Sequence, residues 1–304
     1  MYYDVKIDVS PVYELLSSFI IYTTRKWVNN LDVGTEWIDS VEARFGEKER
    51  QAFAEAAELP FSDYDLLYAL AVEQRPDATI ETYLRDLAEG EDGELLRELK
   101  TYIPATNSED IPRLKGYVPL LRIWYETYFR PIEEQYVALL KEDAEEKRAL
   151  IQKMDPDALV EYASGGLVLE ASLPIEKVVL TPSIHFRPIN TYCFYEGALL
   201  IQYPLDLPEL DEDEPPICLL RLTRALVQPE RLRLLRYVAD QPKSLQDLVT
   251  DLHESEEQLM HHLMRLRVAG LLRVHLVDRD TEKFSIRPDG AAELQMFLES
   301  YIRL

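Results

Sequence analysis

Residues 204–216, PLDLPELDEDEPP, separate the chain into two parts that we expect to fold independently. This segment has neither the period of a helix nor the alternation of a strand, and it is dense in proline and acid. Such a composition is typical of an exposed connection, and 304 residues are enough for two domains with separate cores. The sequence therefore predicts an N-terminal domain over residues 1–204, a linker over 205–216 and a C-terminal domain over 217–304.

The two parts differ in charge. The chain has 56 acidic and 33 basic residues, which give a formal net charge of −23. From residue 216 to residue 304 the sequence has 13 acidic and 13 basic residues, so the whole excess lies in residues 1–215. Exposed charges more than about 8 Å apart are largely screened at physiological salt. An acidic N-terminal part therefore does not exclude a polyanionic partner for the C-terminal part.

Cysteine usage and hydropathy bound the cellular setting. The two cysteines, Cys193 and Cys218, form no Cys-x-x-Cys motif, which is typical of a protein in a reducing cytoplasm. The first residues do not show the basic stretch and apolar core of a signal peptide. The most apolar early run, residues 12–22, is too short to span a bilayer and contains Glu14. We therefore expect a cytoplasmic protein that does not cross a membrane.

The N-terminal part changes from helical to strand patterns along its length. An alternating run at residues 3–9 predicts a strand, and Ser10 with Pro11 signals the start of a helix. Helical periodicity then continues in pieces to residue 163. Four short runs rich in Val, Leu, Ile and Tyr predict strands at 166–173, 176–182, 191–196 and 198–204. We expect a fold that is mainly α with a small β component, including an α+β N-terminal domain.

The C-terminal part begins with two helices. One is expected over residues 217–227, and Pro229 opens the next. The spacing of three leucine or valine positions predicts the buried face of this second helix: Leu232, Leu235 and Val238.

Two further helices follow a common starting pattern. Ser244 with Asp247, and Ser255 with Gln258, have the spacing of a capping box. Gly270 is placed to end the second of these helices. The leucines expected on its buried face are Leu259, Leu263 and Leu266.

A hairpin and a last helix complete the C-terminal part. Residues 271–277 and 283–287 alternate like strands around a polar tip, and helical periodicity returns over 288–302. Helices joined by a short turn and followed by a hairpin predict a winged helix-turn-helix.

Four stretches of the C-terminal part resemble, in the same order along the chain, the sequences of a known protein family. They are LVQPERLRLLRYV, SLQDLV, SEEQLMHHLMRLRVAGLL and FSIRP, within residues 217–290. Together they resemble the ArsR-type bacterial transcriptional regulators, in the long form that carries a helical domain ahead of the winged helix. The resemblance implies a homodimer that binds double-stranded DNA.

The exposed face of the helix over residues 255–269 gives the candidate DNA contacts. With its leucines toward the core, His261 lies on the opposite face, and Gln258 and Arg265 lie beside it. Cations of the hairpin suit phosphates or the minor groove. The residues expected to contact DNA are Ser255, Gln258, His261, Arg265, Arg273, Arg279 and Lys283.

Three residues of the same helix favour a different interpretation. The family often has glutamine and small polar residues where this chain has Glu256, Glu257 and Met260. Carboxylates repel phosphates and match few base edges. A protein-interaction adaptor whose winged helix no longer binds DNA therefore stays open as the alternative.

Other chemistries have little support in the sequence. Residues 244–252 and 291–302, where related regulators carry metal ligands, contain neither Cys nor His, and the spacing of the remaining histidines fits no tight metal pattern. No glycine-rich phosphate loop occurs, and Ser183 near His185 is no triad by itself. We therefore expect no metal, no cofactor and no enzymatic activity.

The expected regulator has two functional parts. The N-terminal domain senses a signal, takes part in assembly, or does both. Tyr117, Trp124 and Tyr128 share one helical face, which predicts core packing or the wall of a pocket for a small-molecule effector. The first and last helices of the C-terminal domain are expected to form the dimer. Two recognition helices would then lie about 34 Å apart on a palindromic operator.

Overall fold

The computed structural model describes residues 3–72, 78–207 and 213–303. The predicted linker over 205–216 includes residues 208–212, which lie outside the described residues. No helix in the described ranges is long and apolar enough to cross a membrane.

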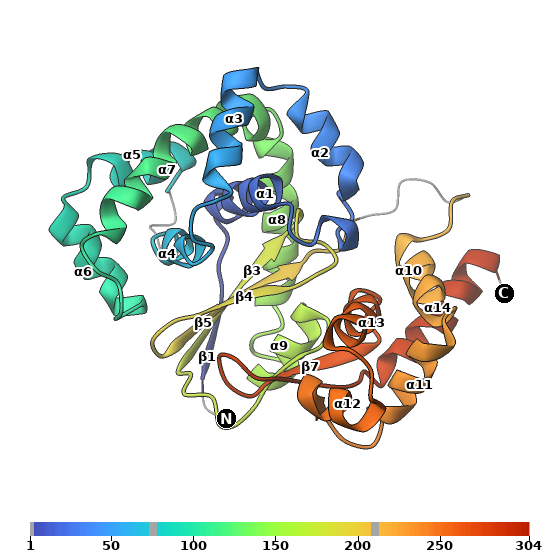
Figure 1. Ribbon diagram of the computed structural model, residues 1–304. Helices are drawn as coiled ribbons and strands as arrows, with labels where there is room; N and C mark the ends of the chain where they lie inside the picture. The colour runs from blue at the N-terminus through green and yellow to red at the C-terminus, as the bar shows by residue number, and fades with distance from the viewer. Residues whose placement is uncertain (1–2, 73–77, 208–212, 304) are drawn as a thin grey trace. The chain divides into compact units, whose positions relative to one another are not determined.

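The chain forms two compact units, whose elements are labelled in Figure 1. The N-terminal unit consists of Tyr2–Lys153 and Ile175–Leu205, and the C-terminal unit consists of Met154–Pro174 and Asp206–Leu304. Each unit contains a four-stranded sheet. The division does not coincide with a boundary at residue 204, because residues 154–174 fold with the C-terminal unit.

The sheet of the N-terminal unit has the strand order β1-β3-β5-β4. Its strands are β1 (Asp4–Ile7), β3 (Lys177–Ser183), β5 (Ala198–Pro204) and β4 (Thr191–Phe194). β1, β3 and β5 are parallel, and β4 runs antiparallel to β5 after a turn at Gly197, whose φ is 65°. The carboxyl ends of three parallel strands therefore meet at one edge.

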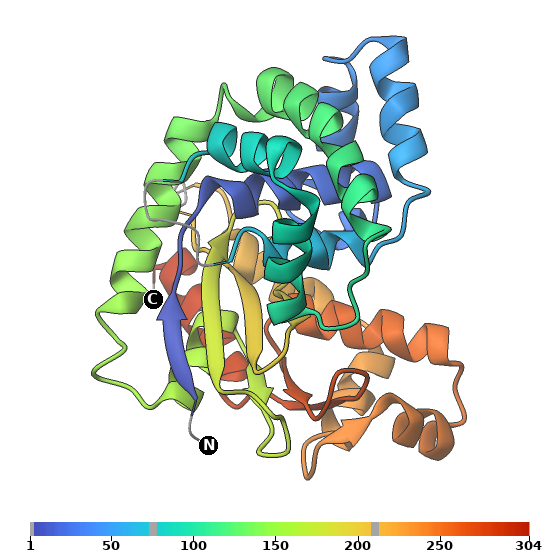
Figure 2. The same ribbon diagram turned by 90° about the vertical axis from the view of Figure 1, so that its left-hand side faces the viewer.

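The helices of this unit gather around α1, mostly beyond the end of the sheet toward which β1 points (Figure 2). The described helices are α1 (Pro11–Thr24), α2 (Gly34–Glu42), α3 (Glu47–Ala56), α4 (Asp63–Ala69), α5 (Ile80–Glu89), α6 (Asp92–Tyr102), α7 (Asp110–Trp124) and α8 (Glu133–Arg148). Short 3₁₀ and π turns lie at Val28–Asn30 and Tyr125–Phe129.

The core of the N-terminal unit is built around α1. Ser10 caps this helix by accepting from Val12 N, Pro11 opens it, and its residues from Val12 to Thr23 are buried. The ring of Phe19 lies 6.0 Å from that of Trp124 on α7. The three aromatic residues singled out on α7 and the following turn are all buried: Tyr117, Trp124 and Tyr128.

The C-terminal unit combines a winged helix with one helix and one strand from earlier in the chain, within residues 154–174. Its sheet has the order β2-β7-β8-β6. The elements are α9 (Pro156–Ser164), β2 (Leu167–Leu169), α10 (Ile217–Leu226), α11 (Pro229–Tyr237), β6 (Lys243–Ser244), α12 (Leu245–Leu252), α13 (Glu256–Val268), β7 (Leu272–Leu276), β8 (Glu282–Ile286) and α14 (Asp289–Ile302). The fold is therefore mainly α with small sheets, as the sequence predicted.

The buried face of α11 differs from the predicted one at Leu232, which is 49% exposed. Leu235 and Val238 are buried as predicted, whereas Leu234 and Arg231 face the core in place of Leu232. Arg231 sets this orientation, because its Nη1 donates to the carbonyls of residues 224 and 225 at the end of α10. The helix turns its arginine inward to satisfy those carbonyls and presents Leu232 outward.

Candidate nucleic-acid interface

The helix-turn-helix is held by local caps and a leucine core. Ser244 and Asp247 form the predicted capping box of α12. His253 ends α12 in the left-handed region, at a φ of 58°. Ser255 caps α13: it accepts from Gln258 N at 3.3 Å, and its hydroxyl donates to Gln258 Oε1 at 3.1 Å. These caps fix the angle at which α13 leaves the turn.

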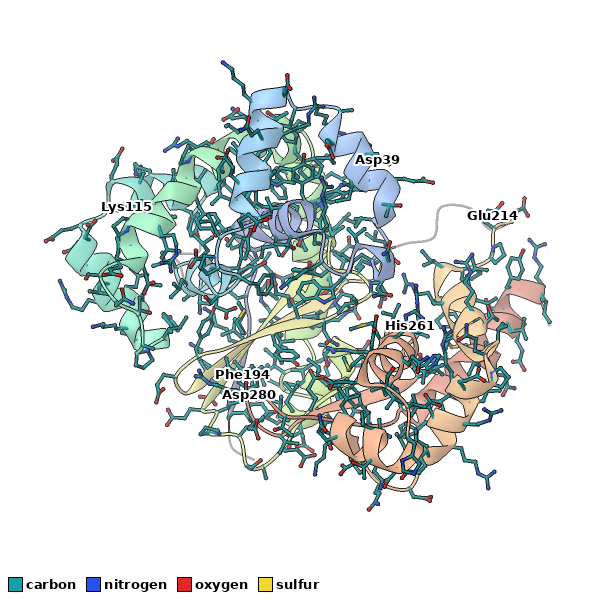
Figure 3. The ribbon with its side chains drawn as sticks, viewed as in Figure 1. Asp39, Lys115, Phe194, Glu214, His261 and Asp280 are labelled. Carbon is teal, nitrogen blue, oxygen red and sulfur yellow. The ribbon has the colours of Figure 1, made fainter. Side chains whose placement is uncertain are left out.

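One side of α13 is buried, and the other carries the predicted contacts. Its three leucines are each at most 1% exposed: Leu259, Leu263 and Leu266. Ser255, Gln258 and His261 are exposed, and Arg265 is half-buried beside them. The location of His261 on α13 is labelled in Figure 3. Within the C-terminal unit, Gln258, His261 and Arg265 thus lie on the outward side of α13, and Ser255 lies at its N-cap.

His261 has an unusual electrostatic setting for an exposed residue. Partial burial, and then the charges of Arg265, His262 and Arg231, lower the pKa of its imidazole from the ordinary value of 6.5. The imidazole is therefore largely neutral at pH 7. In the free protein the imidazole thus donates through one nitrogen and accepts through the other, and protonation next to a duplex would make both nitrogens donors.

The acidic residues of α13 have a structural role as well. Glu256 and Glu257 are exposed and occupy the first turn of the helix. Carboxylates at this position interact favourably with the partial positive charge of a helix N-terminus. Their presence is therefore explained by helix stability, although they bring negative charge to the candidate surface.

The wing offers two of the three predicted cations. Arg279 is exposed in the turn between β7 and β8, next to Asp278 and Asp280. Lys283 lies half-buried on β8, where it pairs with Ser244 of β6 in the sheet register. Both can approach a phosphate without breaking an ion pair within the described contacts of the wing.

Arg273, the third predicted cation, has an ion-pair partner within its own chain. Its Nε lies 2.5 Å from Oε1 of Glu161 on α9, and both side chains are about one-third exposed. The guanidinium is thus neutralised by a carboxylate of its own chain. No local sequence pattern indicates this ion pair, because 112 residues separate Arg273 from Glu161.

β2 extends the wing beyond the two strands that the sequence predicted for it. It pairs in parallel with β7, from Leu167 opposite Val274 to Leu169 opposite Leu276. The buried His275 links the strands: its Nδ1 lies 2.8 Å from Glu170 Oε1, and its Nε2 lies 2.8 Å from Ser285 Oγ. The position of the wing therefore depends on α9 and β2.

No group of three or more His, Cys, Asp or Glu side chains in the described part of the chain is arranged to hold a metal ion. The histidines near α13 are instead packed among arginines, with the rings of His261 and His262 5.7 Å apart. Such a cationic setting disfavours a metal cation.

The helix caps, the buried leucines of α13 and the wing agree with a comparison of the sequence with known protein families. Residues 228–274 match the family of bacterial regulatory proteins named arsR. The arsR match runs from the residue before α11 into β7, so it includes the whole helix-turn-helix. No curated protein and no solved structure matched the chain. The C-terminal unit therefore contains an arsR-type helix-turn-helix.

Proposed function

We propose that this protein is a DNA-binding transcriptional regulator that acts as a homodimer. The observation that carries the proposal is the outward face of α13, where Gln258, His261 and Arg265 lie together on a helix of arsR type that is capped by Ser255. Gln258 suits adenine, and Arg265 suits guanine or a phosphate. A role on bacterial DNA implies a cytoplasmic location.

Exposed apolar side chains support the dimer. They lie on α10 and α14, two helices that pack against each other, and on the residue that ends α10. The exposed set is Ile217, Val227, Met296, Leu298 and Ile302, each at least 43% exposed. A second copy that packs over these two helices would remove exposed apolar side chains from water and would give the pair a twofold axis. The operator would then be a palindrome.

Genome-wide pull-down with the purified full chain tests the proposal. The wild type should enrich palindromic sites, and the double variant His261→Ala plus Arg265→Ala should lose them. Enrichment of the same sites by both proteins would contradict the assignment of α13 as the reading helix.

The salt dependence of DNA binding tests how many phosphates the proposed interface neutralises. Because the wing offers few free cations, the slope of log affinity against log salt should be shallow. Each neutralised phosphate contributes roughly 0.9 to that slope. A slope as steep as that of about eight phosphates would contradict the proposed interface.

The adaptor remains the second candidate because of Glu256 and Glu257. Fluorescence anisotropy of the wild type and the variant with a pool of labelled double-stranded DNA separates the two functions. If the double variant Glu256→Gln plus Glu257→Gln binds DNA and the wild type does not, the adaptor is favoured. We assign the N-terminal unit a role in sensing, since the arsR match leaves it outside the helix-turn-helix.

A further inference from the structure

A buried carboxylate lies at the carboxyl ends of β1 and β3 in the N-terminal unit. Glu14 on α1 is fully buried, and its Oε1 accepts from three donors that belong to Ile184 and His185, directly after β3. The three distances are 3.0 Å, 2.7 Å and 2.5 Å. In open sheets with parallel strands, ligands commonly bind beyond these strand ends.

A chain of hydrogen bonds leads from Trp37 to this carboxylate. Trp37 Nε1 donates to Tyr128 Oη at 2.9 Å, because an indole N–H is only a donor. Tyr128 Oη lies 2.6 Å from His185 Nε2, and His185 Nδ1 lies 2.5 Å from Glu14 Oε1. The chain ties the positions of these three side chains to that of the Glu14 carboxylate.

The second oxygen of the same carboxylate is not satisfied. Glu14 Oε2 is buried and has no hydrogen-bond partner. A buried carboxylate oxygen without a donor costs several times what an ordinary hydrogen bond contributes. A group that reaches Oε2 would satisfy it by donating a hydrogen bond, and an ammonium N–H is a strong donor to a carboxylate.

Aromatic rings surround the imidazole that contacts this carboxylate. The rings of Trp37, Tyr128 and Tyr136 lie 5.6, 5.8 and 5.5 Å from the His185 ring. Trp37 and Tyr136 are half-buried, whereas Tyr128 and His185 are buried, so the cluster extends from the surface of the unit to Glu14. Aromatic faces beside a carboxylate are a favourable environment for an organic cation.

We propose that the N-terminal unit binds a small molecule with a protonated amine, whose N–H donates to Glu14 Oε2 among these rings. The site deepens the sensing role proposed above and rests on it for the effect on DNA. The amine is the effector, and the tryptophan, tyrosine and histidine position the carboxylate that receives it.

Binding of amines to the full-length protein, without DNA, tests the site. Methylammonium, ethylammonium and 1,4-butanediammonium chlorides are titrated while the melting temperature and tryptophan fluorescence are recorded, with sodium chloride at equal ionic strength as the blank. At least one amine should give a saturable rise in melting temperature, since a ligand that binds only the folded state stabilises it. No saturable response to any of the three amines would overturn the proposal.

Two variants assign the response to the cluster. Glu14→Gln should abolish it, because the amide oxygen keeps the three donors while the charge is lost. Glu36→Gln, an exposed carboxylate beside Trp37, is the matched control and should respond like the wild type. An unchanged response in Glu14→Gln would overturn the site. If this variant does not fold, Trp37→Leu should weaken binding about tenfold through the lost aromatic face, and an unchanged affinity would overturn it equally.

Because these titrations contain no DNA, they are independent of the regulator proposal. A protein that binds amine but not DNA would contradict only the function assigned to the C-terminal unit. A protein that binds DNA but not amine would contradict only the site at Glu14.

Discussion

Single residues acquire their chemistry here from their neighbours in space. His261 is exposed on α13, yet Arg265 and Arg231 help to lower the pKa of its imidazole. Arg231 is itself buried in α11, where burial and then Arg265 lower the pKa of its guanidinium. The face that we propose for DNA therefore depends on a cation that cannot itself reach DNA.

DNA binding should depend on the protonation of His261. The nearby phosphates of a duplex favour the charged imidazole, so binding raises the lowered pKa and takes up a proton. Affinity should therefore increase as the pH falls from 7.5 to 5.5. Anisotropy titrations at fixed salt measure this, and His261→Gln should flatten the profile. An equally steep profile in the variant would assign the effect to another group.

Glu161 should restrain DNA binding by holding Arg273. In Glu161→Gln the guanidinium is free to neutralise a phosphate, so affinity should rise and the salt slope should steepen by roughly 0.9. Anisotropy across a salt series measures both quantities. The control is Glu161→Gln combined with Arg273→Gln, which should return to the wild-type slope. A single variant that leaves the slope unchanged would show that Arg273 stays away from DNA.

At the scale of elements, local signals predicted well and remote pairings did not. The caps at Ser244 and Ser255 and the glycine after α13 lie within a few residues of the elements they delimit, so the helix-turn-helix could be predicted. Parallel pairing of β2 with β7 joins residues about a hundred positions apart, and no local pattern records it. Leu232 was predicted to be buried and is exposed, because a contact of Arg231 with another helix, α10, sets the rotation of α11.

The candidate sites, too, could be predicted only where they depend on residues close together in the sequence. The exposed residues of α13 followed from helical period alone, whereas the partner of Arg273 lies on α9. In the sequence, Glu14 is recognisable only as a charge in an apolar run and His185 only as a neighbour of Ser183. Their 2.5 Å contact arises from the adjacency of β1 and β3 in the sheet, which is a property of topology.

Gly166 should be essential for the junction of β2 and β7. Its φ is 124°, and an added Cβ would lie 3.0 Å from the carbonyl oxygen of Leu272. Gly166→Ala should therefore destabilise the C-terminal unit by about 1–3 kcal/mol. Circular dichroism during urea unfolding measures the effect. Tryptophan fluorescence should change less, because Trp27, Trp37 and Trp124 belong to the N-terminal unit.

Gly116→Ala is the matched control for that substitution. Gly116 lies inside α7 with open space around it, so alanine should be neutral or stabilising by up to about 1 kcal/mol. A Gly166→Ala protein as stable as wild type would show that the β2 junction tolerates a side chain.

At the scale of the whole molecule, charge and assembly are divided between the two parts of the chain. The excess of acid lies in residues 1–215, and the exposed apolar side chains of α10 and α14 lie in the part where charges cancel. Self-association through these helices therefore meets little long-range repulsion from their own surroundings.

Leu298→Asp should dissociate the proposed dimer. Leu298 is 43% exposed on α14, and a carboxylate there would be buried without a partner in the assembled state. Sedimentation velocity should show the variant as a monomer at concentrations where the wild type is dimeric. Ser300→Asp, exposed on the same helix, adds an equal charge and should remain dimeric. A monomeric wild type would refute the assembly itself.

The pairing of β2 with β7 has a practical consequence for anyone who handles the C-terminal module on its own. A clone that starts in the acidic segment at residues 204–216 would omit β2, so the outer edge of β7 would expose a row of unbonded amides and carbonyls. Bare edges of this kind recruit strands from other molecules, and such a fragment would tend to precipitate. A usable truncation has to supply residues 154–174 as well, for instance by circular permutation.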